Sequence, residues 1–254
     1  MLLAIDIGNT NIAFGIHLDD DWRAHWRIRT VPDQMPDEYA VLFRELFRDG
    51  GMHLEKVDQA VISSVVPPVT DALTRMLEQH MGKPPIVVGP GIRTGIRIRT
   101  DNPSEVGADL VANAVAAYAR YKQNCIVVDF GTALTFTAVA SPGDLLGVAI
   151  APGLNAAASA LSSNTAQLPR VQLAPPPTAI GRNTVHSIQS GVVFGYIGLV
   201  EALLTRMRQE MDGQALAVAT GGLARVIAPL STQFTAIEPW LTLDGLRIIA
   251  NRNA

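Results

Sequence analysis

The chain has 254 residues, of which 48% are hydrophobic and 6% aromatic, enough to bury one large core or two smaller ones. Its formal net charge of −3 argues against nucleic acid as a partner, because proteins that bind the phosphate backbone carry a basic face. The single cysteine, Cys125, excludes a disulfide framework, and since no apolar run reaches the roughly 18 residues of a membrane span, we predict a cytoplasmic protein without membrane contact.

The chain begins with a predicted strand pair around an acidic turn. An apolar run covers residues 2–5, and Phe14–His17 is predicted as the second strand of a hairpin. Between them lie Asp6, Gly8 and the polar residues 9–11. A glycine turn lets backbone N–H groups point at a phosphate, and a carboxylate beside it can hold a cation against phosphate oxygens. The turn is therefore a candidate phosphate-binding loop.

Hydrophobic periodicity then predicts alternating strands and helices. Expected strands are Trp22–Arg29, Gln59–Val66 and Ile86–Val88, and expected helices are Glu38–Phe47, Val69–His80 and Val111–Tyr118. This alternation is typical of an α/β protein.

Asp109 lies at or near the start of the predicted helix Val111–Tyr118. An acidic residue in this position is commonly a solvent-exposed cap that stabilises the helix by about 1 kcal/mol. The alternative is a general base that takes a proton from a substrate hydroxyl, a role that phosphoryl transfer usually gives to an Asp. Spacing alone does not decide between the two.

The pattern of the first turn returns in the middle of the chain. The apolar run Cys125–Val128 leads into Asp129–Thr132, again with an Asp, a Gly and a hydroxyl. One Asp-x-Gly is a weak signal, since these residues close many strands as turns. Two copies half a chain apart favour an internal duplication. We predict two similar α/β halves, residues 1–118 and 119–254, with a nucleotide cleft between them.

The second half repeats the plan of the first. Its expected elements are the strands Thr135–Val139, Leu146–Ile150 and Ala215–Ala219, the helices Leu154–Ser162 and Ser187–Met207, and an irregular proline-rich loop, Thr165–Thr178. Cys125, inside an apolar strand, is predicted to be a small buried hydrophobe.

Seven motifs along the chain occur in the order of a known family. They are Asp6-Ile7-Gly8-Asn9-Thr10-Asn11, Ile62-Ser63-Ser64-Val65-Val66-Pro67, Asn102-Pro103 to Gly107-Ala108-Asp109, Asp129-Phe130-Gly131-Thr132-Ala133, Ala151-Pro152-Gly153, Gly181-Arg182-Asn183-Thr184 and Thr220-Gly221-Gly222. With these motifs the chain resembles the type III pantothenate kinases, of the acetate and sugar kinase, Hsp70 and actin superfamily. The resemblance implies a duplicated actin-like architecture of two ribonuclease-H-like halves, and the ATP-dependent phosphorylation of pantothenate that begins coenzyme A biosynthesis.

The resemblance also implies roles for individual residues. Asp109 would be the proton acceptor. ATP would bind Asp6, Ile7, Gly8, Asn9, Thr10, Asn11, Ile12, Ala13 and Thr132, with Mg²⁺ beside Asp6 and a monovalent cation, K⁺ or NH₄⁺, held by Asp129. Pantothenate would contact Thr100, Gly107, Ala108, Asp109 and Leu110, and Thr184 would close the pocket from the partner subunit of a homodimer.

Three positions depart from the family pattern. Leu110 stands where most relatives have Arg, Thr100 where a Tyr is usual, and Thr137 where an acidic residue is usual. An Arg-to-Leu change removes a charge and a fork of donors, which would weaken pantothenate binding if its carboxylate relied on them. Two alternatives therefore stay open: a regulatory ATP-binding relative without turnover, or a kinase for another small hydroxylated acid or sugar.

Three arginines, Arg93, Arg97 and Arg99, precede Thr100 on an expected strand. Their side chains are predicted to form a solvated face. Alternatively, one of them supplies the positive charge that is missing at Leu110.

Overall fold

The computed structural model describes residues 1–165 and 167–254, and its contacts group these into two compact units. Unit 1 comprises Met1–Ile96, Asp101–Ala116 and Leu241–Ala254, and unit 2 comprises Arg97–Thr100 and Ala117–Trp240. This grouping differs from a single division after residue 118, because the C-terminal helix packs on the sheet of unit 1.

The sheet of unit 1 has five strands in the order β3-β2-β1-β4-β5. Its members are β1 (Leu2–Ile7), β2 (Asn11–Leu18), β3 (Asp21–Arg29), β4 (Gln59–Ser64) and β5 (Ile86–Val87). The first three form an antiparallel meander, and β4 and β5 add parallel strands. The predicted hairpin is confirmed by this pairing.

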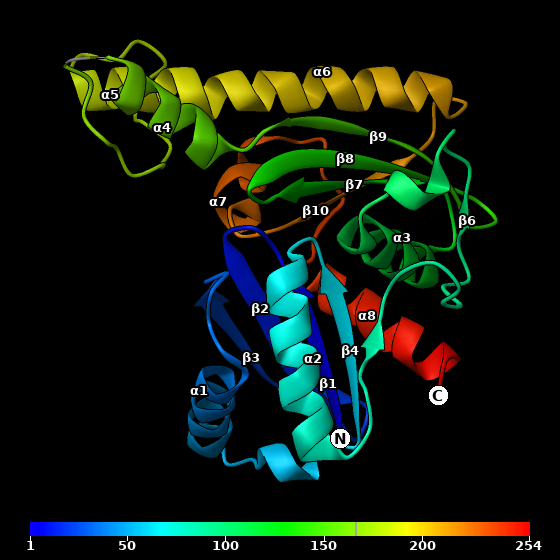
Figure 1. The fold of residues 1–254 in the computed structure, drawn as a ribbon. Helices are drawn as coiled ribbons and strands as arrows, with labels where there is room; N and C mark the ends of the chain where they lie inside the picture. The colour runs from blue at the N-terminus through cyan, green and yellow to red at the C-terminus, as the bar shows by residue number, and fades with distance from the viewer. Residues whose placement is uncertain (166) are drawn as a thin grey trace. The chain divides into compact units, whose positions relative to one another are not determined.

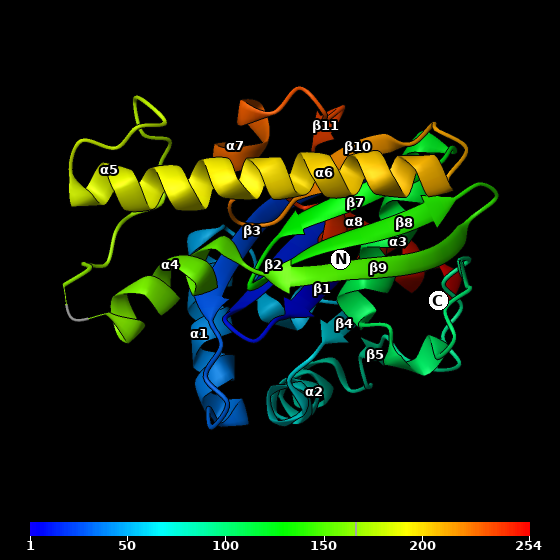
Figure 2. The same ribbon diagram turned by 90° about the horizontal axis from the view of Figure 1, so that it is seen from above.

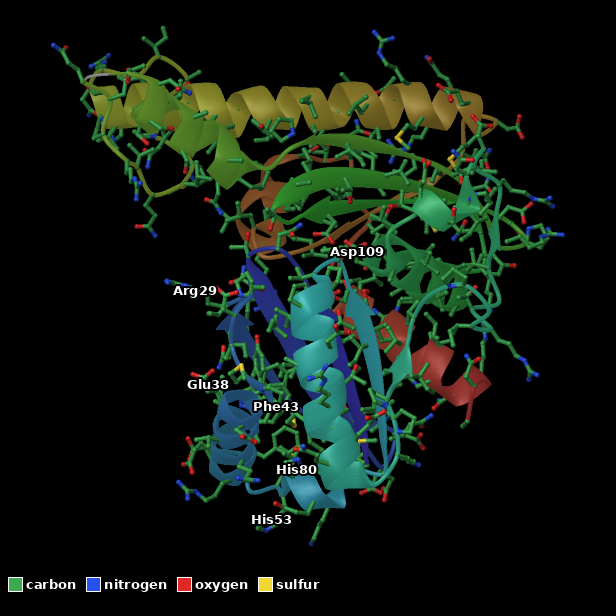
Figure 3. The ribbon with its side chains drawn as sticks, viewed as in Figure 1. Arg29, Glu38, Phe43, His53, His80 and Asp109 are labelled. Atoms are coloured by element: carbon green, nitrogen blue, oxygen red, sulfur yellow. The ribbon has the colours of Figure 1, made fainter. Side chains whose placement is uncertain are left out.

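Helices cover both faces of this sheet, which explains why its central strands are apolar on both sides. The helices α1 (Pro36–Asp49) and α2 (Pro67–Met81) share one hydrophobic core with β1 and β2, while α8 (Leu241–Arg252) contacts β1 and β4 (Figure 1). Phe43 of α1, labelled in Figure 3, stacks on Phe14 of β2 with 4.4 Å between ring centroids. A short helical turn, η1 (Leu54–Lys56), precedes β4.

The sheet of unit 2 has six strands in the order β11-β10-β7-β8-β9-β6. Its members are β6 (Arg97–Ile98), β7 (Cys125–Phe130), β8 (Ala133–Ala140), β9 (Asp144–Pro152), β10 (Leu216–Thr220) and β11 (Ala236–Ile237). Again three antiparallel strands, β7, β8 and β9, are followed by parallel strands, β10 and β11. The order β9-β8-β7-β10-β11 repeats β3-β2-β1-β4-β5, so the predicted duplication is confirmed.

A long helical run covers one face of the second sheet (Figures 1 and 2). It consists of α5 (Thr184–Gln189), a π-helical turn η3 (Ser190–Phe194) and α6 (Gly195–Glu210), and is longer than the predicted helix Ser187–Met207. The other helical segments are α3 (Ala108–Tyr121), α4 (Leu154–Asn164), α7 (Ala224–Ile227), η2 (Pro103–Glu105) and η4 (Ala228–Leu230). The irregular loop after α4 is confirmed where the structure describes it; Ala166 lies outside the described residues.

By length and composition alone, one described segment could cross a membrane: the helical run Thr184–Glu210. Polar residues interrupt its sequence, so it contains no long uninterrupted apolar run. Its buried residues Val193, Val200 and Leu204 belong to the core of unit 2, whereas most of its apolar window is not buried. Cys125 is fully buried, and this burial raises the pKa of its thiol to about 12, as expected of a structural cysteine.

Candidate functional site

The turn between β1 and β2 has the tight geometry that the sequence predicted. The Gly8 N–H donates to the carbonyl oxygen of Asn11, 3.0 Å away, and a Cβ on Gly8 would lie 3.2 Å from that oxygen. Asp6 sits at the end of β1, opposite Ala13 of β2. The turn therefore combines a carboxylate with a closely folded backbone, which are the parts that hold phosphate and its metal ion.

A residue that the sequence did not single out supports this turn from outside. The Thr30 hydroxyl donates to the Gly8 carbonyl oxygen at 2.6 Å, and the Thr30 N–H donates to the Thr10 carbonyl oxygen at 3.0 Å. Thr30 is only 8% exposed. It follows β3 outside every motif, so its contact with the turn depends on the pairing of β2 with β3 and has no signal in the local sequence.

Asp109 lies in the first turn of α3 and is half-buried (Figure 3). Burial raises the pKa of its carboxyl, and backbone hydrogen bonds, including one from the Leu110 N–H at 2.9 Å, offset part of that rise. A Cβ on Gly107 would overlap the Asp109 Oδ1, so a larger residue there would displace the Asp109 carboxylate. Of the two alternatives that the sequence left open for Asp109, the solvent-exposed cap does not fit the structure, since the side chain is half-buried and the pKa of its carboxyl is raised.

The corresponding turn of unit 2 places Asp129 at the end of β7. Asp129 is opposite Thr135 of β8 and Thr220 of β10. Gly221 has φ +93°, and a Cβ on it would overlap the Asp129 Oδ1. The loops after β7 and β10 thus approach the same carboxylate, and side chains larger than glycine are excluded there.

Two buried hydroxyls share the face of the sheet that carries Asp129. Thr135 is opposite Asp129, and Thr137, two residues further along β8, lies on the same face of the sheet. The Oγ1 atoms of both threonines have no hydrogen-bond partner among the described residues. Thr137 is 1% exposed. Unsatisfied buried oxygens beside a carboxylate are suited to a cation, so the residues present fit a monovalent ion at Asp129.

In residues 1–165 and 167–254, no three His, Cys, Asp or Glu side chains lie close enough together to hold a metal ion.

Ion pairs connect the segment Arg97–Thr100, which precedes Asp109 in the chain, to β9. Arg97 and Arg99 donate from Nε to the two oxygens of Asp144, at 2.6 and 3.2 Å. Both arginines are about half exposed, so the predicted solvated face is confirmed for these two, although each is also paired with a carboxylate. The Oγ1 of Thr100 is buried without a partner among the described residues, and the side chain of Leu110 is buried as well.

Thr184 begins α5 and lines a pocket of about 440 Å³ in unit 2. Leu161 and Ile188 make much of its wall apolar, and the hydroxyl of Tyr196 at its edge donates to the Pro152 carbonyl at 2.9 Å. Thr184 and Thr132 are both exposed, Thr132 in the turn after β7.

Comparison with known proteins gives one consistent result. The family model described as type III pantothenate kinase matches residues 2–206. Curated type III pantothenate kinases from Moorella thermoacetica and Geobacter sulfurreducens are 48% and 49% identical to the chain over 253 residues, covering 100% of this chain and 100% and 99% of the relatives.

Solved structures share the fold at lower identity. A conserved protein from Campylobacter jejuni, described as a Baf family transcriptional activator, has a TM-score of 0.64 at 20% identity, covering 99% of this chain and 98% of that one. Component A of (R)-2-hydroxyglutaryl-CoA dehydratase from Acidaminococcus fermentans has a TM-score of 0.53 at 13% identity, with 100% and 96% covered. Both show similarity of fold alone.

Proposed function

Because the chain belongs to the type III pantothenate kinase family, we propose that it transfers the γ-phosphoryl group of ATP to the primary hydroxyl of pantothenate. The product, 4′-phosphopantothenate, begins coenzyme A biosynthesis. A kinase of this family uses ATP with a divalent metal. The identity of nearly half of all residues to full-length relatives disfavours both a regulatory role and a different acceptor.

The observation that carries the mechanism is the half-buried Asp109. A carboxylate whose pKa is raised by burial is a better proton acceptor near neutral pH than an exposed one. We assign to Asp109 the removal of the hydroxyl proton of pantothenate as its oxygen attacks the γ-phosphorus. The proton ends on the Asp109 carboxyl, and ADP leaves.

The first turn supplies the phosphate contacts in this proposal. ATP binds residues 6–13 through their backbone N–H groups and short side chains. When bound, Mg²⁺ neutralises developing charge on the phosphates, and the Asp6 carboxylate holds it or its waters. Asp129 would hold a monovalent cation, K⁺ or NH₄⁺, a role supported by the unsatisfied hydroxyls of Thr135 and Thr137.

The acceptor side of the site contains Thr100, Gly107, Ala108 and Leu110. The Gly107 Cα leaves the space beside the Asp109 carboxylate that a larger residue would fill. The unsatisfied Thr100 hydroxyl is a candidate donor to pantothenate. Leu110 is buried and packs inside the protein, so it offers no charge to a ligand. Because the usual Arg would offer one, we predict that Leu110 weakens the binding of the pantothenate carboxylate.

We further propose a homodimer through the helical run Thr184–Glu210. Only 28% of its most apolar window is buried. Gly191, Gly195 and Gly198 lie on one exposed face, with open space where each Cβ would be, which permits close approach of a second backbone. Ile180 and Val185, close in sequence to the start of the run, are also exposed apolar side chains, and Thr184 at the start of the run would then reach the pantothenate of the other subunit. We place this dimer in the cytoplasm.

The test is ADP release by purified protein with Mg-ATP and K⁺, with and without pantothenate. Pantothenate-dependent release, with 4′-phosphopantothenate identified by mass spectrometry, supports the proposal. Asp109→Asn should reduce kcat by at least about 100-fold, since general bases contribute 10²–10⁴-fold. Binding of Mg-ATP without release would support the regulatory alternative, and an Asp109→Asn enzyme as fast as the parent would exclude Asp109 as the base.

A further inference from the structure

We propose that Thr30 is a positioning residue for ATP: its hydroxyl sets the direction in which the N–H groups of the β1–β2 turn face the phosphates. The inference rests on the proposed function, because it takes this turn to be the phosphate loop. Thr30 lies outside the motifs on which the assignment of the site depends. It does not touch the reacting atoms in this proposal and acts through Gly8 and Thr10.

Two hydrogen bonds connect Thr30 to the turn. Its hydroxyl holds the Gly8 carbonyl at 2.6 Å, and its N–H holds the Thr10 carbonyl at 3.0 Å. The Gly8 N–H in turn donates to the Asn11 carbonyl at 3.0 Å. Three hydrogen bonds thus constrain the turn, and Thr30 donates two of them.

Peptide geometry gives these bonds a consequence for ligand binding. In a planar trans peptide, the C=O and the N–H point in opposite directions. The peptide that carries the Gly8 carbonyl also carries the Asn9 N–H, and the peptide of the Thr10 carbonyl carries the Asn11 N–H. Because both carbonyls point at Thr30, both N–H groups point away from it. Two backbone donors therefore face the side of the turn opposite Thr30, and in this proposal that side receives the phosphates.

The surroundings make Thr30 suited to this task. The residue is 8% exposed, so water competes little for its hydroxyl, and the pairing of Asn11 with Arg29 of β3 places it beside the turn. Arg29, labelled in Figure 3, is exposed at the end of β3. A hydrogen bond inside a buried setting restricts the peptide planes before ATP arrives, which reduces the cost of ordering the loop on binding.

The experiment compares Thr30→Val with Thr30→Ser. Valine keeps the shape and the backbone N–H bond but removes the hydroxyl, whereas serine keeps the hydroxyl. Thr94→Val is the matched control, since the Thr94 hydroxyl also donates to a backbone carbonyl, that of Ile96, in another loop of unit 1. For each protein we would measure KM for ATP, KM for pantothenate, and the Kd of Mg-ATP by calorimetry without pantothenate.

We expect Thr30→Val to raise both KM and Kd for ATP by about tenfold, the equivalent of one well-formed hydrogen bond, with KM for pantothenate within about twofold of the parent. Thr30→Ser and Thr94→Val should resemble the parent. The inference is overturned if Thr30→Val binds ATP as the parent does, if serine fails to restore binding, or if both KM values rise equally.

The same measurements separate the two proposals. If the parent binds Mg-ATP but releases no ADP with pantothenate, and Thr30→Val still binds ATP more weakly, the kinase assignment fails while the role of Thr30 holds. If the parent does not bind Mg-ATP, the turn is not a phosphate loop and the inference is overturned.

Discussion

Gly245 of α8 lies so close to Ala112 of α3 that a Cβ on Gly245 would overlap the Ala112 carbonyl oxygen. The neighbouring Thr242 hydroxyl donates to the fully buried Asn113 side chain at 2.8 Å. Both contacts lie within unit 1. The helix that carries Asp109 is thus fixed against a helix from the far end of the chain, by backbone contact and by a buried hydrogen bond.

We predict that Gly245→Ala destabilises the protein. The obstruction is backbone, which cannot rotate away as a side chain can, so the two helices must separate at a cost of about 1–3 kcal/mol. Urea unfolding followed by circular dichroism measures the loss. Gly147→Ala in β9 is the control, because a Cβ there meets no atom within 4 Å. Equal stability of both variants with the parent would show that α3 and α8 are not tightly packed.

Asp109 should make stability depend on pH. Its folded-state pKa is raised by burial, so the folded protein holds this proton more strongly than the unfolded chain. The resulting stabilisation is complete below the unfolded pKa, near 4, and is lost as pH rises through the folded pKa. Asp109→Asn does not titrate, so its stability relative to the parent should increase over that interval. Urea unfolding at several pH values would show a constant difference if Asp109 were an ordinary exposed carboxyl.

The raised pKa also predicts the pH profile of the reaction. Since Asp109 must be deprotonated to accept a proton, kcat/KM for pantothenate should fall as pH decreases through its raised pKa. Initial rates of ADP release at saturating Mg-ATP test this. An acidic limb at the position of an unperturbed carboxyl would contradict the assignment.

The proposed dimer predicts that one substitution disrupts both assembly and acceptor binding. Gly195→Arg places a charged side chain on the exposed glycine face of α6, so it should yield monomers and raise KM for pantothenate strongly, because Thr184 would no longer reach the other subunit. Analytical ultracentrifugation and kinetics measure the two effects. Asp71→Arg, on the exposed side of α2, is the control. A monomeric parent would contradict the proposal, and so would a dimeric Gly195→Arg protein.

Cys125 should be inert in the native protein. It is fully buried and the pKa of its thiol is raised to about 12, so almost no thiolate exists at pH 8. Ellman's reagent should therefore react only after unfolding in urea. Rapid labelling of the folded enzyme would show that β7 opens easily.

The sequence by itself determined the elements whose signal is local. The two apolar strands that end in Asp-x-Gly, and the meander after each, follow from hydrophobic periodicity and turn chemistry, so the duplication could be predicted from the order of residues alone. The candidate site was likewise predicted from the motifs around Asp6, Asp109 and Asp129.

Only the tertiary structure decided the features that depend on distant partners. The helix α8 and the short strand β11 were not predicted, since a two-residue strand gains its hydrogen bonds from its neighbour and α8 takes its place from the sheet of unit 1. Thr30 could not be connected to Gly8 from spacing, because β3 brings it there. The environment of Asp109 was equally undecided: burial, a property of the whole fold, raises its pKa and distinguishes it from an exposed helix cap.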